Sequence, residues 1–339
     1  MSVDQQLSIG LIIHSRGDPW FEDGNIVLVT HETPTAFRLH RGVLARHSEI
    51  FRDMLDFPQP EVKLVDYEGC QVICMYDGPL ELSNLVKALY DGPQFQNRCL
   101  DDFFYLAGIL RLASKYFITN LRTQAIRFLA QTWSFTLEGH DQMVETALRS
   151  PNVSDLSYPY VHPLHVLNLA RETNLQIVLP SAFYFLSLYS LADILKADHP
   201  KLQPEHTSKP SSTLSPTDIQ FYTTMYQYRL HLILHFVRQF CERRASTSCE
   251  SETICSGRFR RLQQQLSRSW SLRTGPLHYM HQAAREVSRD QTICTACRSR
   301  FQDDIVQLRT KTWEELPLVI GLPSWSEMQA SDLPPEQSS

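Results

Sequence analysis

The chain has 339 residues, of which 42% are hydrophobic and 20% charged, and its formal net charge is −5. This composition is typical of globular domains, so it excludes a mainly disordered chain and an overall basic protein, and the length allows two or three domains. The sequence contains no run of about 18 apolar residues, and its N-terminus lacks the pattern of a secretion signal, which predicts a cytoplasmic or nuclear protein without membrane contact. The eight cysteines are therefore expected to be reduced thiols.

The first regular pattern is a hairpin followed by two short helices. Residues 26–29 form a β-branched and apolar run, residues 33–35 break it, and residues 37–39 alternate apolar with polar side chains, which indicates strand, turn and strand. From His40 the hydrophobic period becomes helical, and Ser48 is placed to cap the second helix. The apolar stripe of the two helices consists of Val43, Leu44, Ile50, Phe51, Met54 and Leu55.

This stretch resembles the signature of the BTB/POZ domain, in which a strand ending in Phe-x-x-His is followed by a basic residue and then by Leu-Ala-x-x-Ser-x-x-Phe-x-x-Met. Eight residues agree in type and spacing: Phe37, His40, Arg41, Leu44, Ala45, Ser48, Phe51 and Met54. The resemblance implies a small sheet flanked by helices over residues 20–135. We expect Leu44, Phe51 and Met54 in the core, and His40 to be a core histidine satisfied at the corner between strand and helix.

The remainder of this part continues the same order of elements. Residues 69–79 read as a third strand closed by a turn, residues 82–90 as a helix, and residues 106–129 as two amphipathic helices joined at Lys115-Tyr116. The motifs DGNIVLV, HRGVLARHS, GCxVI, LYDG and RLASKY are most similar in pattern to BTB proteins of basidiomycete fungi.

After this part the sequence predicts a mostly α-helical C-terminal region, so the expected fold class is α+β. The predicted divisions are an N-terminal arm (1–19), the BTB/POZ domain (20–135), a helical extension (136–198), a flexible linker rich in Pro, Ser and Thr (199–217), a helical C-terminal region with a candidate zinc site (218–328) and a disordered tail (329–339). Near the end, Trp313 and Trp325 are expected on short helices that dock on the body of the protein.

Four cysteines in the C-terminal region form the main group of candidate metal ligands in the sequence. Cys249-x5-Cys255 and Cys294-x2-Cys297 are two pairs of thiols, and a Cys-x2-Cys turn places two thiolates on one side of a tight loop, as tetrahedral zinc requires. An alternative set replaces the first pair by His278 and His281, whose i,i+3 spacing presents both rings on one helix face. A third interpretation leaves the cysteines as unconnected thiols.

No catalytic motif is present, so the sequence predicts a protein that is not an enzyme. The resemblance implies an interaction protein: a homodimer, a transcriptional co-regulator or a substrate adaptor of a cullin ubiquitin ligase. The cullin-binding version carries an apolar-x-Glu element after the second helix, and Glu61 is displaced from that register. A homodimer is expected because Leu55 and Phe57, together with the arm residues Ile9, Leu11 and Ile12, are apolar without an obvious partner.

The alternative function is a regulator that associates with nucleic acid. Residues 236–310 carry 13 Arg against 7 acidic residues, and arginines beside a zinc-binding loop can hold phosphates. The arginines concerned are Arg258, Arg260, Arg261, Arg268, Arg298 and Arg300. The same side chains could instead be solvated helix faces paired with Glu250, Glu286, Asp303 and Asp304.

Overall fold

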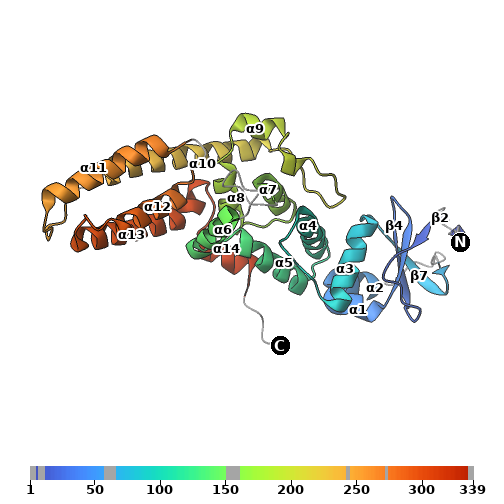
Figure 1. The fold of residues 1–339 in the computed structure, drawn as a ribbon. Helices are drawn as coiled ribbons and strands as arrows, with labels where there is room; N and C mark the ends of the chain where they lie inside the picture. Colours follow the sequence, from blue (N-terminus) through green and yellow to red (C-terminus); the bar gives the residue numbers. More distant parts are fainter. Residues whose placement is uncertain are drawn as a thin grey trace. The chain divides into compact units, whose positions relative to one another are not determined.

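The computed structural model describes residues 5–6, 12–56, 66–149, 161–241, 245–271 and 274–334, and it confirms the α+β class. The chain forms two compact units (Figure 1). The first unit is Met1–Phe128 together with Pro204–Pro210, and the second is Leu129–Gln203 together with Ser211–Ser339. Among the described helices, none combines the length and the apolar character needed to cross a membrane.

The first unit is built on a five-stranded mixed sheet in the order β3-β5-β4-β7-β6. The predicted hairpin is β4 (Ile26–Thr30) and β5 (Thr35–Leu39), which pair antiparallel with Leu28 opposite Phe37. The predicted third strand is β7 (Cys70–Met75), which pairs parallel with β4. The short strands β3 (Ser15–Arg16) and β6 (Asp66–Tyr67) form the edges, and β1 (Gln5–Gln6) pairs with β2 (Ile12–Ile13) as a separate ribbon.

Five helices accompany this sheet. They are α1 (Arg41–His47), α2 (Glu49–Asp56), α3 (Pro79–Asp91), α4 (Leu100–Lys115) and α5 (Thr119–Thr132). Ser48 caps α2 as predicted, because its Oγ accepts the backbone N–H of Phe51 at 3.0 Å. The same hydroxyl donates to the carbonyl of Tyr116 at 2.6 Å, which connects α2 to the end of α4. The core therefore joins the hairpin to the helices through Leu28, Phe37, Leu44 and Phe51, which are all buried.

The regular elements of the second unit, within its described part, are helices. Its helices are α6 (Leu137–Arg149), α7 (Pro163–Glu172), α8 (Leu179–Leu186), α9 (Leu191–Lys196), α10 (Pro216–His235), α11 (Glu252–Ser269), α12 (Pro276–Arg289), α13 (Thr295–Val319) and α14 (Trp325–Asp332), with a π-helical turn (Phe236–Phe240) after α10. One apolar cluster joins α10, the π-helical turn, α11, α12 and α13. Of these elements, α12 and α13 run side by side in Figure 1.

The segment predicted as a flexible linker, residues 199–217, differs from that expectation. It contains a 3-10 turn (Pro200–Leu202), and Pro204–Pro210 packs with the first unit. Its C-terminal end caps α10, because Oγ of Ser215 accepts the backbone N–H of Asp218 at 3.1 Å. Buried contacts along the segment explain its structure, and such contacts leave no periodic pattern in the sequence.

The C-terminal boundary also differs from the prediction. The predicted disordered tail starts at residue 329, whereas α14 continues to Asp332, and residues 335–339 lie outside the described part. Trp313 lies in the long helix α13 and not on a short one. The predicted docking on the body of the protein is present for Trp313, whose Nε1 donates to the carbonyl of Phe135 at 3.0 Å. Trp325 packs on Trp313: their rings stack with centroids 5.3 Å apart, and Nε1 of Trp325 donates to the carbonyl of Trp313 at 2.8 Å.

Candidate metal centre

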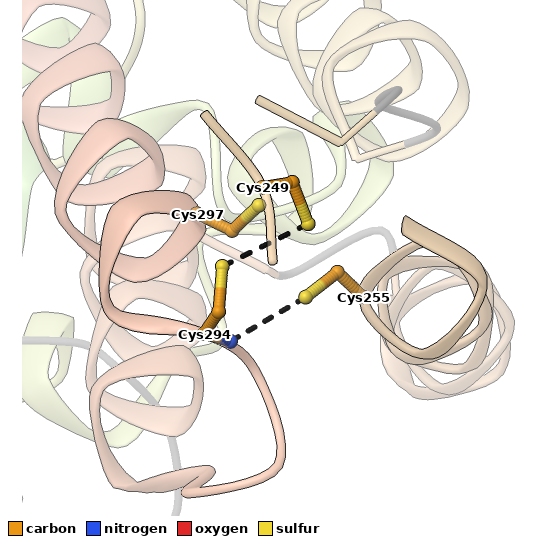
Figure 2. Close-up of side chains that lie close together, drawn as sticks. All are labelled: Cys249, Cys255, Cys294 and Cys297. Atoms are coloured by element: carbon orange, nitrogen blue, oxygen red, sulfur yellow. Dashed lines mark hydrogen bonds between the residues drawn. The ribbon is translucent and has the colours of Figure 1, made fainter. Parts of the chain in front are cut away.

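The four cysteines of the first-choice set lie together in the second unit (Figure 2). Cys249 is in the loop before α11 and Cys255 is in the first turn of that helix, while Cys294 is the N-cap of α13 and Cys297 lies in its first turn. Their Sγ atoms all lie within 4.8 Å of one another. Figure 2 shows the four side chains pointing toward a common centre from three segments of the chain.

The helix ends explain why the sulfurs converge. Residues at the N-cap and three positions later stand on the same side of a helix start, so Cys294 and Cys297 form a pair as soon as α13 forms. The loop of Cys249 turns back because the backbone N–H of Cys249 donates to the carbonyl of Ser246 at 3.0 Å. Cys255 and Cys297 are buried in the apolar cluster of the unit, and Cys249 and Cys294 pack against it.

Backbone N–H groups surround the sulfurs. The N–H of Cys294 donates to Sγ of Cys255 at 3.4 Å, and the N–H of Ser246 donates to Sγ of Cys297 at 3.3 Å. The Sγ atoms of Cys294 and Cys249 are 3.8 Å apart. A tetrahedral zinc with Zn–S bonds of about 2.3 Å holds its sulfurs about 3.8 Å from one another. The thiols therefore lie at a separation suited to four-coordinate zinc, with N–H donors placed to stabilise thiolates.

The thiols differ in their protonation. Backbone N–H groups of Cys297 and then Glu250 lower the pKa of Cys294 to about 6, because they hydrogen-bond the thiolate. Burial instead raises the pKa of Cys255 and of Cys297. Four thiolates at this distance repel one another, so all four can be deprotonated together only when a cation lies between them. This is the chemistry of a closed metal site.

The alternative ligands His278 and His281 do not join this group. Both lie on α12, and Nε2 of His281 is 4.0 Å from Oε1 of Glu145, on α6. Within the part of the chain that the structure describes, the four cysteines are the group of His, Cys, Asp or Glu side chains whose ligand atoms could hold a metal ion. Ser246, whose backbone N–H donates to Sγ of Cys297, was not among the predicted site residues, although the run Ser246-Thr247-Ser248 before Cys249 is a turn signal that points to such a loop.

The eight signature residues have structural places in the first unit. Leu44 and Phe51 are in the core, and Ala45 and Met54 pack on it. His40, predicted as a core histidine, is instead half-buried at the corner between β5 and α1, where Nδ1 lies 3.0 Å from Oη of Tyr90 and Nε2 lies 3.2 Å from Oδ1 of Asp23. Arg41 donates from Nη2 to the carbonyl of Leu55 at 2.9 Å, which ties α1 to the end of α2. These polar residues hold the hairpin and helices in place.

The arginines near the cysteines are divided between ion pairs and solvent. Nε of Arg258 is 3.7 Å from Oδ2 of Asp290, and Nε of Arg300 is 3.9 Å from Oδ2 of Asp304. Arg298 donates from Nη1 to Oε1 of Gln291 at 3.0 Å. Three others are exposed on α11: Arg260, Arg261 and Arg268. These contacts resemble the solvated helix faces of the second interpretation, although of the two acidic partners Asp304 was predicted and Asp290 was not.

Comparison with known proteins identifies one domain. Residues 23–132 match the profile of the BTB/POZ domain, which is a protein-interaction domain and not typically an enzyme. The match covers β4 to α5 and includes all eight signature residues. A search of curated proteins found no match to the chain.

Proposed function

We propose that the chain is a non-enzymatic interaction protein that self-associates through its BTB/POZ unit and acts as an adaptor or co-regulator, while its helical unit is stabilised by zinc. The observation that carries the interaction role is the BTB/POZ match over residues 23–132, because these domains mediate protein partnerships and dimerisation. The similarity to basidiomycete BTB proteins and the cytoplasmic or nuclear location stay predictions.

The zinc part of the proposal is supported by the four converging thiols. Zinc bound by four cysteines has no open coordination position, so it stabilises structure and does not activate water. Here it would connect the loop of Cys249, the start of α11 and the start of α13. The two cysteine pairs are separated by 38 residues between Cys255 and Cys294, so the metal would close a long loop in the chain.

Metal analysis tests the zinc proposal. Protein purified without chelator should contain about one zinc per chain. Replacing Cys294 and Cys297 together by Ser should remove the metal, because two of four ligands are lost. Cys99→Ser is the matched control: Cys99 is an exposed N-cap of α4 in the first unit, where Ser also caps, so this variant should retain zinc. Wild-type protein without zinc, or a double variant that keeps it, would contradict the proposal.

Self-association needs a surface, and the structure changes the candidate residues. Leu55, expected to be exposed, is only 8% exposed and belongs to the core. Phe57, Ile9, Leu11 and the side chain of Ile12 lie outside the described residues, as does Glu61 of the cullin element. Among the exposed apolar side chains of the first unit are Ile50 at 38% and Phe117 at 62%. Each is next in sequence to a member of a buried ring pair, because Phe51 and Tyr116 stack with centroids 4.8 Å apart, and the candidate surface is the one next to this ring pair.

Light scattering of the full chain at micromolar concentration tests self-association. The expected mass is that of a dimer. The double variant Ile50→Lys with Phe117→Asn should shift the mass toward the monomer if this surface is used, and Asn tolerates the positive φ of residue 117. A wild-type protein that stays monomeric throughout would overturn the homodimer, and a dimeric double variant would assign the interface to other residues.

A further inference from the structure

The segment Pro204–Pro210, called the strap below, packs with the first unit although the residues before and after it belong to the second. The chain therefore leaves the second unit, contributes seven residues (204 to 210) to the first and returns. Within the strap, Ser208 is 0% exposed, and Pro210 is also buried. At these two residues the strap is therefore packed and not solvated.

The strap lies against α4. The imidazole ring of His206 stacks on Phe104, with centroids 4.8 Å apart and planes inclined by 19°. At Gly108, one helical turn later, an added Cβ would lie 3.0 Å from Oγ of Ser208 and 3.2 Å from Cγ of Glu81. Glycine at this position thus allows the close approach of the strap, since any larger side chain would compete with Ser208 for the same space.

The shape of the strap is set by its own hydrogen bonds. The backbone N–H of Ser208 donates to Nδ1 of His206 at 2.9 Å, and the N–H of Lys209 donates to the carbonyl of His206 at 3.1 Å. Nζ of Lys209 is 3.0 Å from Oε1 of Glu205, and prolines stand at both ends. A short segment that its own hydrogen bonds hold in this shape loses little further conformational entropy on docking. This applies whether the segment belongs to the same chain or to another protein.

We propose that the face of α4 formed by Phe104 and Gly108, together with Glu81 of α3, is a peptide-docking site that the strap occupies in this structure. The partner it fits is a short segment of another protein with the chemistry of the strap: an imidazole or aromatic ring, a serine-sized residue two positions later and a proline two positions after that. This site is separate from the proposed self-association surface and from the zinc site, so it can fail while both of them hold.

The covalent attachment of the strap makes it a competitor of any partner. Tethering within the same chain gives the strap an effective concentration on the order of millimolar at its site. A partner segment of the same sequence must therefore displace the strap, and the site becomes accessible when the strap is removed. The docking site is occupied by default and responds to partners that bind more tightly than the strap.

The experiment uses the full chain with residues 204–210 replaced by Gly and Ser at unchanged length. The probe is a fluorescent peptide of residues 199–216, and binding is followed by fluorescence polarisation. We expect at least about tenfold tighter binding to the strap-replaced chain than to the wild type, because the competitor is gone. Peptides with His206→Ala or Ser208→Glu should bind poorly, whereas Thr207→Glu, at an exposed position, should bind like the native peptide.

A variant of the site itself completes the test. Gly108→Leu in the strap-replaced chain should abolish peptide binding while circular dichroism and zinc content stay unchanged. Absence of peptide binding to a folded strap-replaced chain, or equal binding of all three peptide variants, would overturn the proposal. A concentration-dependent doubling of the mass of the native chain that Gly108→Leu abolishes would identify a second copy as the occupant and would overturn the assignment to a partner protein.

Discussion

His140 is a buried histidine whose protonation is unfavourable in the folded protein. It is 1% exposed, and both ring nitrogens lack a hydrogen-bond partner among the described residues. Its ring lies among aromatic rings, with the centroid of Trp313 at 5.0 Å and that of Phe185 at 5.3 Å. Burial, and then the nearby charge of Arg309, lower the pKa of His140 to about 3. The imidazole therefore stays neutral in the native state under all but strongly acidic conditions.

This shift predicts a loss of stability in acid. In the unfolded chain His140 titrates near pH 6.5. Between about pH 6.5 and 3 the unfolded state therefore binds a proton that the folded state does not bind. The free energy of unfolding then decreases by up to about 1.4 kcal/mol for each unit that the pH falls. His140→Leu should remove this dependence, making the decrease in unfolding free energy from pH 6.5 to pH 5 about 2 kcal/mol smaller than in the wild type. Urea unfolding at both pH values measures the difference. Thiolate protonation affects both proteins alike, and identical slopes would contradict the prediction.

At the scale of elements, the docking of α14 depends on one carboxylate. Asp332 is buried at the end of this helix, and its Oδ2 accepts the backbone N–H groups of Gln176 and Ile177, each at 2.8 Å. Both N–H groups lie just before Val178, the N-cap of α8, so no carbonyl of that helix accepts them. The carboxylate thus satisfies two buried donors on an element more than 150 residues away in the sequence.

We expect Asp332→Ala to destabilise the protein by about 1–3 kcal/mol, because two buried donors lose their acceptor. Hydrogen exchange should show faster exchange in α14 and at Gln176 and Ile177. Ser331→Ala, at the exposed neighbouring position, is the matched control and should leave the unfolding free energy within about 0.5 kcal/mol of the wild type. Unchanged exchange in α14 of the Asp332 variant would show that the aromatic stack alone holds the helix.

The elements that the sequence predicted well are those whose signal is local. The hairpin β4–β5 and the helices α1 and α2 follow from alternation and period over a few residues, and Ser48 caps where its type and position indicated. The convergence of the four cysteines could be anticipated because their spacing brings two pairs to two helix starts. The choice between Cys249 with Cys255 and the histidine pair needed the tertiary structure, since both spacings suit a metal.

The predictions that differed from the structure concern distant contacts. Leu55 reads as an unpartnered apolar residue, and its burial depends on the packing of α2 in the first unit. The strap and α14 are held by Gly108, Phe104, Gln176 and Ile177, which are far from them in the chain. No pattern within a short window can contain such pairings, so the linker and the tail resembled disordered segments.

For the whole molecule, the division into two units predicts different responses to metal removal. The four cysteines lie in the second unit, and so do four of the five tryptophans: Trp133, Trp270, Trp313 and Trp325. Tryptophan fluorescence therefore reports mainly the second unit, whereas hydrogen exchange in β4 and β7 reports the first. The apolar cluster around α10 to α13 extends well beyond the four cysteines, so removal of zinc should loosen the second unit without unfolding it completely.

A strong chelator should lower the fluorescence-detected unfolding temperature, by about 2–4 °C for each kcal/mol of stability lost. Faster hydrogen exchange is expected in the loop before α11 and at the starts of α11 and α13, where the four proposed ligands lie, and unchanged exchange is expected in β4 and β7. The variant with Cys294→Ser and Cys297→Ser should already unfold at the lower temperature and should not respond to chelator, because it holds no metal to remove. Cys99→Ser should respond like the wild type. A chelator effect of equal size in the double variant, or a loss of protection in the sheet of the first unit, would show that the metal does not act through the four cysteines.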